Sequence, residues 1–358
     1  MTGGRRKQVG LASHEDVRRR YVDAKDLARL EAVAGFSFRP FSIASGRDGP
    51  APRDSEAESD LAEFASGLDV LLVGDGAPFV SVAVMAAAPH LTLLGELDGD
   101  RFGYRLDIAE ARGRGVRVVD TSHASSWPTA EWALGLALVG LRNAGAFFRL
   151  MITHEQTAFP FAERAGLGYD GAELTGKRVG MIGFGHLARR LVELLRPFQV
   201  EIAVFDPFVP RELAEPYGVA LGSLEAILAA DVVFVLVPHT PTTEGMLSGA
   251  ELELLRPGAF LVNVSRGKVI ETAPLLARLE RGDVVACLDV FDPEPVPLDS
   301  PFLDLPNVFL SPHLAGVTEE SRRRFFSLMV DECLRHFDGL DPLAELTPEV
   351  VRLRTSPP

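Results

Sequence analysis

The stretch VGMIGFGHLARRL, residues 179–191, decides the fold of this chain. Its apolar start is typical of a strand, and the pattern Gly183-x-Gly185-x-x-Ala188 then leads into a helical sequence. Gly183 permits a tight turn, and Gly185 lets a pyrophosphate approach the backbone because it carries no side chain. The N-terminus of the following helix offers unpaired N–H groups and a partial positive charge to phosphates. The stretch therefore predicts the strand–turn–helix of a dinucleotide-binding domain.

A second apolar run ends at Asp206, about 20 residues after the glycine turn. A carboxylate at this place accepts hydrogen bonds from the ribose diol of an adenosine and repels a 2′-phosphate. Pro207 and Phe208 follow, and neither brings a cation that would bind such a phosphate. We therefore predict NAD rather than NADP as the cofactor. The alternative is a purely structural glycine turn beside a surface aspartate.

Strand-like and helix-like runs alternate along the chain. Around the glycine turn, the runs KRVGMIGF, IAVFDP, DVVFVLVP, AFLVNVS and VVACLDVF are continuously apolar, which is typical of strands covered on both faces. Earlier β-prone runs lie at 7–12, 36–41, 68–74, 91–95 and 116–120. Helical candidates between them lie at 15–33, 57–66, 79–88 and 107–113, while 43–60 reads as a surface loop. This alternation predicts an α/β protein with parallel sheets.

The segment WPTAEWALGLALVGLRNAGAFFRLM, which begins at Trp127, predicts one long helix that starts near Pro128. Most of its surface is apolar. Such a helix is expected to be buried, either between domains or against a partner subunit.

Three polar residues follow apolar strands of the same block: Arg266 in LVNVSRGKVI, Glu294 in LDVFDPEPVP and His313 in NVFLSPHLAG. Ligands of open α/β sheets bind beyond the carboxyl ends of the strands, so the three side chains are expected at one crevice. Arg266 offers a planar fork of donors to a carboxylate or carbonyl oxygen. His313 suits transfer of a hydroxyl proton, and Glu294 would orient the imidazole. Taken singly, each residue also fits a structural or solvated role.

Together these motifs resemble the D-isomer-specific 2-hydroxyacid dehydrogenase family, and residues 177–317 carry the resemblance most densely. It rests on GFGHLA, the VFDP strand end, VLVPHTPTTEGML, LVNVSRGKVI, LDVFDPEP and LSPHLAG. The resemblance implies two Rossmann-like or flavodoxin-like domains with parallel sheets, the cofactor domain being inserted in a split substrate domain. We expect residues 1–127 plus 318–358 to form the substrate (catalytic) domain and 128–317 to form the NAD-binding Rossmann domain.

The resemblance also implies roles for individual residues. Arg266, Glu294 and His313 would be the catalytic set, and Asp289 would hold the nicotinamide carboxamide. The other cofactor contacts would come from Gly183, Gly185, His186, Leu187, Asp206, Pro238 and Val264. A formate-oxidising member is expected to carry glutamine in place of the glutamate, so Glu294 speaks against that subtype. The segment WPTAEWALGLAL resembles the family's interdomain and dimer helix, and we expect a homodimer.

The substrate loop departs from the family pattern. In GELDGDRFGYRLD, residues 95–107, the chain keeps Gly95 and Gly99 but also carries Glu96, Asp98 and Asp100. Acidic side chains beside a substrate carboxylate are unfavourable unless they point away. One interpretation has these acids capping turns in solvent while the loop amides still bind the substrate. The other has the loop selecting a substrate with hydroxyls or an ammonium group, with Arg101 adding a carboxylate contact.

Composition limits the classes of partner. The 358 residues contain 36 Lys and Arg against 50 Asp and Glu, a net charge of −14, which argues against nucleic acid and anionic membranes as partners. Two cysteines do not make a disulfide framework or a cysteine zinc site, and no spaced set of metal ligands is apparent. A polar segment follows the basic N-terminus where a signal peptide would be apolar, so we expect a cytoplasmic location.

The predicted function is an NAD-dependent oxidoreductase that transfers hydride between nicotinamide and a D-2-hydroxy acid/2-keto acid pair, with a small carboxylate as substrate. Two alternatives remain open at the level of sequence. One is an NAD(H)-sensing regulatory protein on the same fold, and the other is an enzyme inactive on ordinary 2-keto acids. The sequence leaves open which acid is used and in which direction.

Overall fold

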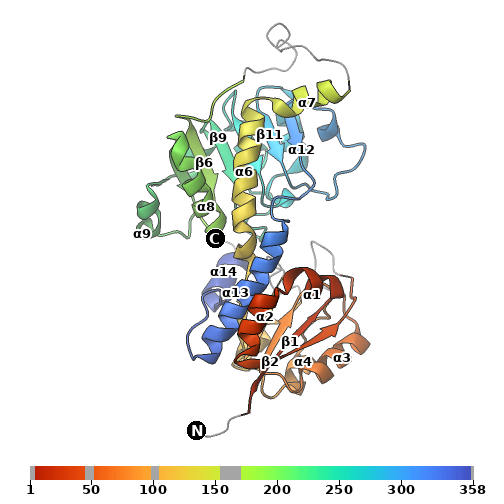
Figure 1. The fold of residues 1–358 in the computed structure, drawn as a ribbon. Coiled ribbons are helices and arrows are strands. Elements are labelled where there is room, and N and C mark those ends of the chain that lie inside the picture. Colours follow the sequence, from red (N-terminus) through yellow and green to blue (C-terminus); the bar gives the residue numbers. More distant parts are fainter. Residues whose placement is uncertain (1–4, 45–51, 98–104, 154–170, 356–358) are drawn as a thin grey trace. The chain divides into compact units, whose positions relative to one another are not determined.

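The chain divides into two compact units, which Figure 1 shows in a computed structural model. The structure describes residues 5–44, 52–97, 105–153 and 171–355. One unit comprises Met1–Ser125 and Thr318–Arg352, and the other comprises Ser126–Val317 and Leu353–Pro358. Each unit contains a parallel sheet of its own, so the predicted α/β class is confirmed.

The first unit has the strand order β2-β1-β3-β4-β5, with all neighbours parallel. Its strands are β1 (Lys7–Ser13), β2 (Ala34–Pro40), β3 (Val70–Val73), β4 (Leu93–Glu96) and β5 (Arg117–Asp120). Its helices are α1 (Glu15–Tyr21), α2 (Ala24–Glu31), α3 (Ser55–Ala65), α4 (Val82–Ala87), α5 (Ile108–Gly113), the 3₁₀ turn Ser122–Ser125, α13 (Glu319–Phe337) and the part of α14 (Pro348–Thr355) up to Arg352.

Two helix starts in this unit differ from the prediction because aspartate side chains cap the helices there. The expected helical run 15–33 is two helices, since the Asp23 side chain accepts a hydrogen bond from Lys25 N–H and starts α2. The helix predicted at 57–66 is present as α3 but begins at residue 55, so the predicted loop over 43–60 was wrong from residue 55 on. There the Asp54 side chain accepts from the N–H groups of Glu56 and Ala57 and starts α3.

Helices cover both faces of the first sheet. Leu71 and Val73 of β3 pack with α3, α4 and α5, whereas Val70 and Leu72 of the same strand pack with α1, α2 and α13. Alternate residues of one strand therefore enter two different cores, which explains why the strand is apolar throughout.

The second unit has the strand order β12-β11-β10-β9-β6-β7-β8, all parallel. Its strands are β6 (Arg178–Ile182), β7 (Glu201–Phe205), β8 (Ala220–Leu221), β9 (Val232–Val235), β10 (Phe260–Asn263), β11 (Val285–Leu288) and β12 (Val308–Leu310). Its α-helices are α6 (Ser126–Leu141), α7 (Ala144–Ile152), α8 (His186–Leu195), α9 (Arg211–Ala214), α10 (Leu224–Leu228), α11 (Gly249–Glu253) and α12 (Thr272–Glu280). Short 3₁₀ turns lie at Arg196–Phe198, Glu215–Tyr217, Gly267–Val269 and Pro301–Leu303. From β6 the sheet grows to one side through β7 and β8, and from β9 on it grows to the other side. Ligands of such sheets bind at the point between the two strands where the direction changes, here β6 and β9.

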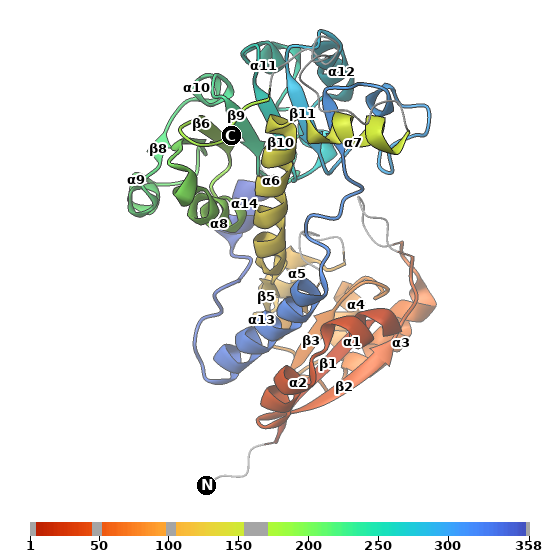
Figure 2. The ribbon, with the colours of Figure 1, turned by 45° about the horizontal axis from the view of Figure 1, so that its top comes forward.

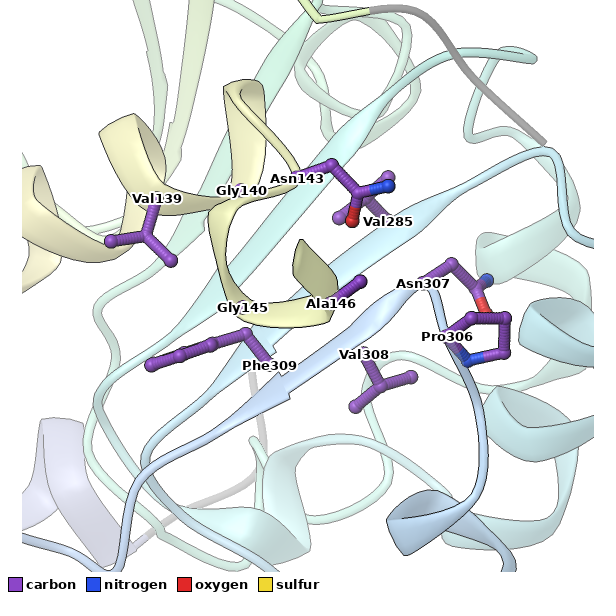
Figure 3. Close-up of a pocket in the computed structure, with 10 residues that line it drawn as sticks. All are labelled: Val139, Gly140, Asn143, Gly145, Ala146, Val285, Pro306, Asn307, Val308 and Phe309. Carbon is purple, nitrogen blue, oxygen red and sulfur yellow. The ribbon is translucent and has the colours of Figure 1, made fainter. Parts of the chain in front are cut away.

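The predicted long apolar helix is broken in two. Its first part, α6, packs with α8 against one face of the second sheet (Figure 2), where Leu136 and Ala137 are fully buried. The chain then turns at Asn143, whose φ of 52° lies in the left-handed region that asparagine tolerates better than most residues. Figure 3 shows this junction, where a shallow pocket lies between the ends of α6 and α7 and the strands β11 and β12.

Within the described residues, no single helix is long and apolar enough to cross a membrane. The segments Ser122–Leu141 and Ala144–Ile152 together have sufficient length and apolarity, but they are bent by 74° at the break.

Candidate active site

The glycine turn lies directly after β6, at the point where the strand order reverses. Gly183 has a φ of +97°, and a Cβ atom there would lie only 2.9 Å from Val237 Cγ1 and 3.1 Å from the Leu236 carbonyl oxygen. Around Gly185, by contrast, a Cβ atom would meet nothing within 4 Å. The first glycine is therefore required by conformation and packing. The second leaves open space at the N-terminus of α8, where a dinucleotide phosphate fits.

Three predicted cofactor residues lie around this turn. Asp206 follows β7 directly; its Oδ2 accepts a hydrogen bond from Phe184 N–H at 2.9 Å and its Oδ1 accepts from Phe208 N–H at 3.0 Å. Each carboxylate oxygen has two acceptor sites, so one on each remains for a ribose diol. His186 and Leu187 form the first turn of α8, where His186 is exposed and Leu187 is half-buried. These residues fit NAD.

Arg266 follows β10 in a turn that is held by its neighbours. The Asn263 side chain accepts from Ser265 N–H at 3.0 Å and donates to the Arg266 carbonyl at 3.1 Å. A Cβ atom on Gly267 would lie 1.9 Å from the Phe291 carbonyl oxygen, so the turn after β10 lies tightly against the loop after β11. This contact joins the loop of Arg266 to the loop that carries Glu294. No local sequence pattern marks Gly267, because its role depends on a tertiary contact.

Glu294 and His313 form a close pair. His313 Nδ1 lies 2.5 Å from Glu294 Oε1, and the side chains are 27% and 14% exposed respectively, so the pair can reach a ligand without being open to bulk water. Since Nδ1 faces the carboxylate, Nε2 is the ring nitrogen left to exchange a proton with a substrate. Two of the three predicted catalytic side chains, Glu294 and His313, are therefore in direct contact.

Asp289 is buried, with an exposed fraction of 0%. Its carboxylate accepts hydrogen bonds from Ser311 Oγ–H at 2.5 Å and from the N–H groups of Leu314 and Ala315 at 3.1 and 2.9 Å. The carboxylate therefore holds the loop around His313. Its contact with a nicotinamide carboxamide stays a prediction.

Pro238 and Val264 follow β9 and β10, so they lie at the same edge of the sheet as the other predicted cofactor residues. Pro238 is exposed, and its carbonyl accepts a hydrogen bond from Thr243 Oγ1 at 2.6 Å. Val264 is 5% exposed and belongs to the core beneath the site.

The predicted substrate residues belong to the first unit. Gly95 lies inside β4, where a Cβ atom would be 2.5 Å from Met329 Sδ and 2.6 Å from Leu72 Cδ2, so close packing accounts for this glycine. Gly99 and Arg101 lie outside the described residues, as do Asp98 and Asp100.

Glu96, the acid at the base of the substrate loop, is paired with a cation. The Arg105 guanidinium donates from Nη1 to Glu96 Oε1 and from Nη2 to Asp75 Oδ1, both at 2.9 Å. Arg105 and Glu96 are both buried, whereas the Asp75 side chain is half exposed. For Glu96, this geometry supports the interpretation in which the acid points away from a bound carboxylate.

Neither cysteine is suited to catalysis. Cys287 and Cys333 are both free and buried, and burial raises the pKa of each thiol to about 12. Both therefore remain protonated at neutral pH. Within the described ranges, no group of three or more His, Cys, Asp or Glu side chains is arranged to hold a metal ion.

Comparison with known proteins decides the family. Residues 134–315 match the NAD-binding domain of the D-isomer specific 2-hydroxyacid dehydrogenases. The chain belongs to this family. It is 30% identical to a glyoxylate reductase of Korarchaeum cryptofilum over 278 residues, which cover 77% of this chain and 82% of that protein. The fold resembles that of D-mandelate dehydrogenase from Rhodotorula graminis, with a TM-score of 0.79 at 21% identity and coverage of 96% of this chain and 98% of that one.

Longer relatives are also similar. The chain is 31% identical over 306 residues to D-3-phosphoglycerate dehydrogenase of Methanocaldococcus jannaschii. The match covers 84% of this chain but only 55% of that protein. The chain thus spans about half the length of the phosphoglycerate dehydrogenases that it matches.

Proposed function

We propose that this protein is an NAD-dependent dehydrogenase of D-2-hydroxy acids, or equally a reductase of 2-keto acids. The observation that carries the proposal is the 2.5 Å pair of His313 and Glu294, placed after strands of the same sheet whose glycine turn and Asp206 fit NAD. Membership of the family supports the same activity. The names of two relatives, glyoxylate reductase and D-3-phosphoglycerate dehydrogenase, support a short hydroxy or keto acid as substrate.

Each residue of the pair has a defined task in this reaction. During oxidation, His313 Nε2 takes the proton of the substrate hydroxyl, and during reduction it returns that proton to the carbonyl oxygen. Glu294 accepts the hydrogen bond from Nδ1–H, fixes the ring and stabilises the imidazolium that forms. Arg266 offers its guanidinium to the carbonyl and carboxylate oxygens. When bound, NAD would accept the hydride that leaves the substrate C2 during oxidation, and NADH would donate one to that carbon during reduction.

The test is oxidation of NADH with a panel of 2-keto acids: glyoxylate, hydroxypyruvate, pyruvate and 2-ketoglutarate. We expect turnover with at least one of them. Tight NADH binding without turnover of any keto acid would instead favour the NAD(H)-sensing regulatory protein.

Replacing Asp206 should change the choice of cofactor. Asp206→Asn keeps an oxygen that can accept from Phe184 N–H but removes the charge that repels a 2′-phosphate. We expect the preference for NADH over NADPH, measured as the ratio of kcat/KM values, to fall by about tenfold or more, which is about 1.4 kcal/mol. A ratio that stays the same would argue against the ribose role of Asp206.

Exposed apolar residues of α7 support a homodimer. Phe148, Met151 and Ile152 are 64%, 57% and 60% exposed, an unusual concentration on one short helix. We expect Phe148→Glu to shift the protein from dimer to monomer in sedimentation velocity, whereas a wild-type monomer would refute the dimer.

We also propose a cytoplasmic location. Two free, buried cysteines agree with it, and cell fractionation tests it.

A further inference from the structure

The backbone of His313 adopts a conformation that needs support. Its φ is 51°, in the left-handed region that residues with a Cβ atom rarely adopt. Its N–H donates to the carbonyl oxygens of Asp289 and Ser311, at 2.8 and 3.0 Å. The direction of the imidazole toward Glu294 therefore depends on how firmly the loop around residue 313 is held.

One buried carboxylate ties both sides of this loop. Asp289 accepts from Ser311 Oγ before His313 in the chain, and from the N–H groups of Leu314 and Ala315 after it. Asp289 itself belongs to the segment that follows β11, and its exposed fraction is 0%. The Ser311 hydroxyl is the only side-chain group among these three donors, so it is the one that a substitution can remove.

A tryptophan from outside the sheet completes the chain of hydrogen bonds. Ser311 has a single hydroxyl proton, which it donates to Asp289, and its oxygen accepts from Trp132 Nε1–H at 3.1 Å. An indole N–H can only donate and an ionised carboxylate can only accept, so the direction of both bonds is fixed. Trp132 is half-buried on α6, and its ring packs against the same core as Ala315.

We propose that Trp132 is a positioning residue for His313, which it holds through Ser311 and Asp289 in the orientation that faces Glu294. The inference rests on the proposed proton-transfer role of His313. It assigns to α6, otherwise a packing helix, a specific contribution to catalysis. If Trp132 served packing alone, its replacement would lower stability without altering the His313–Glu294 pair.

The first arm of the test removes the indole donor or the serine relay. Trp132→Phe keeps an aromatic ring, and Ser311→Ala removes one oxygen atom. For each variant we expect kcat to fall by about tenfold or more, an altered pH profile of kcat, and an unchanged KM for NADH. The double variant should be no slower than the slower single variant, since both changes break the same chain of bonds. Losses that multiply in the double variant would overturn the proposal.

A matched control separates positioning from packing. Leu136 lies one helical turn further along α6, is fully buried in the same core, and has a purely apolar side chain. We expect Leu136→Ala to lower Tm while leaving the pH profile unchanged. If Trp132→Phe behaves like this control, with a lower Tm and a wild-type pH profile, Trp132 is a packing residue and the proposal fails.

A second readout does not depend on turnover. The proton between His313 Nδ1 and Glu294 should give a downfield NMR resonance, which His313→Asn would identify by its loss. We expect Trp132→Phe and Ser311→Ala to shift or broaden this resonance, and Leu136→Ala to leave it in place. Failure of the proposed function would appear as no turnover by the wild-type protein, whereas failure of this inference would appear as an unchanged resonance.

Discussion

We expect His313→Asn to lower kcat for the preferred keto acid by about 10²- to 10⁴-fold, the range that positioned acid–base groups contribute. Asparagine suits the position because it tolerates a positive φ such as the 51° of His313, so the loop keeps its conformation. Its amide can still donate to Glu294, but it cannot exchange a proton with the substrate. NADH binding, measured by fluorescence titration, should stay close to that of the wild type. Stopped-flow measurement of a single turnover would place the loss in the chemical step.

The companion variant Glu294→Gln should have a smaller effect. Glutamine keeps an oxygen that accepts from His313 Nδ1–H at the position now 2.5 Å away, but it no longer stabilises the imidazolium by charge. We expect a decrease in kcat that is concentrated in one limb of the pH profile.

The measurement of NADH binding decides the role of His313. If His313→Asn weakened NADH binding as much as it lowered turnover, His313 would be a binding residue and the proton-transfer role would be refuted.

Much of the fold and of the candidate site can be predicted from the apolar runs of the sequence and the polar residues that follow them. Continuous apolar runs predicted the buried parallel strands, and the polar residues directly after them follow strands of one sheet in the structure. This works because the carboxyl ends of parallel strands meet at one edge, so sequence position implies proximity. Arg266, Glu294 and His313 can be singled out in this way.

Features that depend on a single tertiary contact cannot be predicted from the sequence in this way. The apolar run through α6 and α7 does not predict the turn at Asn143, because the spacing of apolar residues carries no information on the sign of φ at a single residue. Gly267 looks like any glycine until the Phe291 carbonyl is seen beside it. The link from Trp132 to Ser311 joins residues 179 positions apart, a separation that no local pattern encodes.

The buried pair of Arg105 and Glu96 predicts the largest effect on stability. Arg105→Met keeps much of the side-chain volume but removes the cation that the structure places 2.9 Å from Glu96 Oε1, with both groups almost fully buried. Removing one partner of such a pair costs about 3–5 kcal/mol. We expect the free energy of unfolding of the first unit to fall by that amount. The double variant Arg105→Met/Glu96→Leu should recover most of it, because no uncompensated charge is then buried.

The location of the two tryptophans makes this loss measurable. Trp127 and Trp132 are the two tryptophans of the chain, and both lie in the second unit. Hydrogen exchange of the β4 peptide reports on the first unit, while tryptophan fluorescence reports on the second. Arg105→Met should accelerate exchange around Glu96 well before it changes the fluorescence transition in urea. Equal changes in hydrogen exchange and in fluorescence would mean that the two units unfold together. The decrease in the free energy of unfolding would then be measured from the common urea transition.

The same pair bears on the choice of substrate. An unpaired glutamate at the base of the substrate loop would repel a carboxylate, whereas a glutamate held by Arg105 contributes little net field. Arg105→Met should therefore destabilise the first unit, and at high pH, where the buried Glu96 is ionised, it should also raise KM for an anionic keto acid. The double variant, which carries neither charge, should return KM toward the wild-type value. A KM that is unaffected by Arg105→Met even at high pH would show that Glu96 does not act on the bound carboxylate.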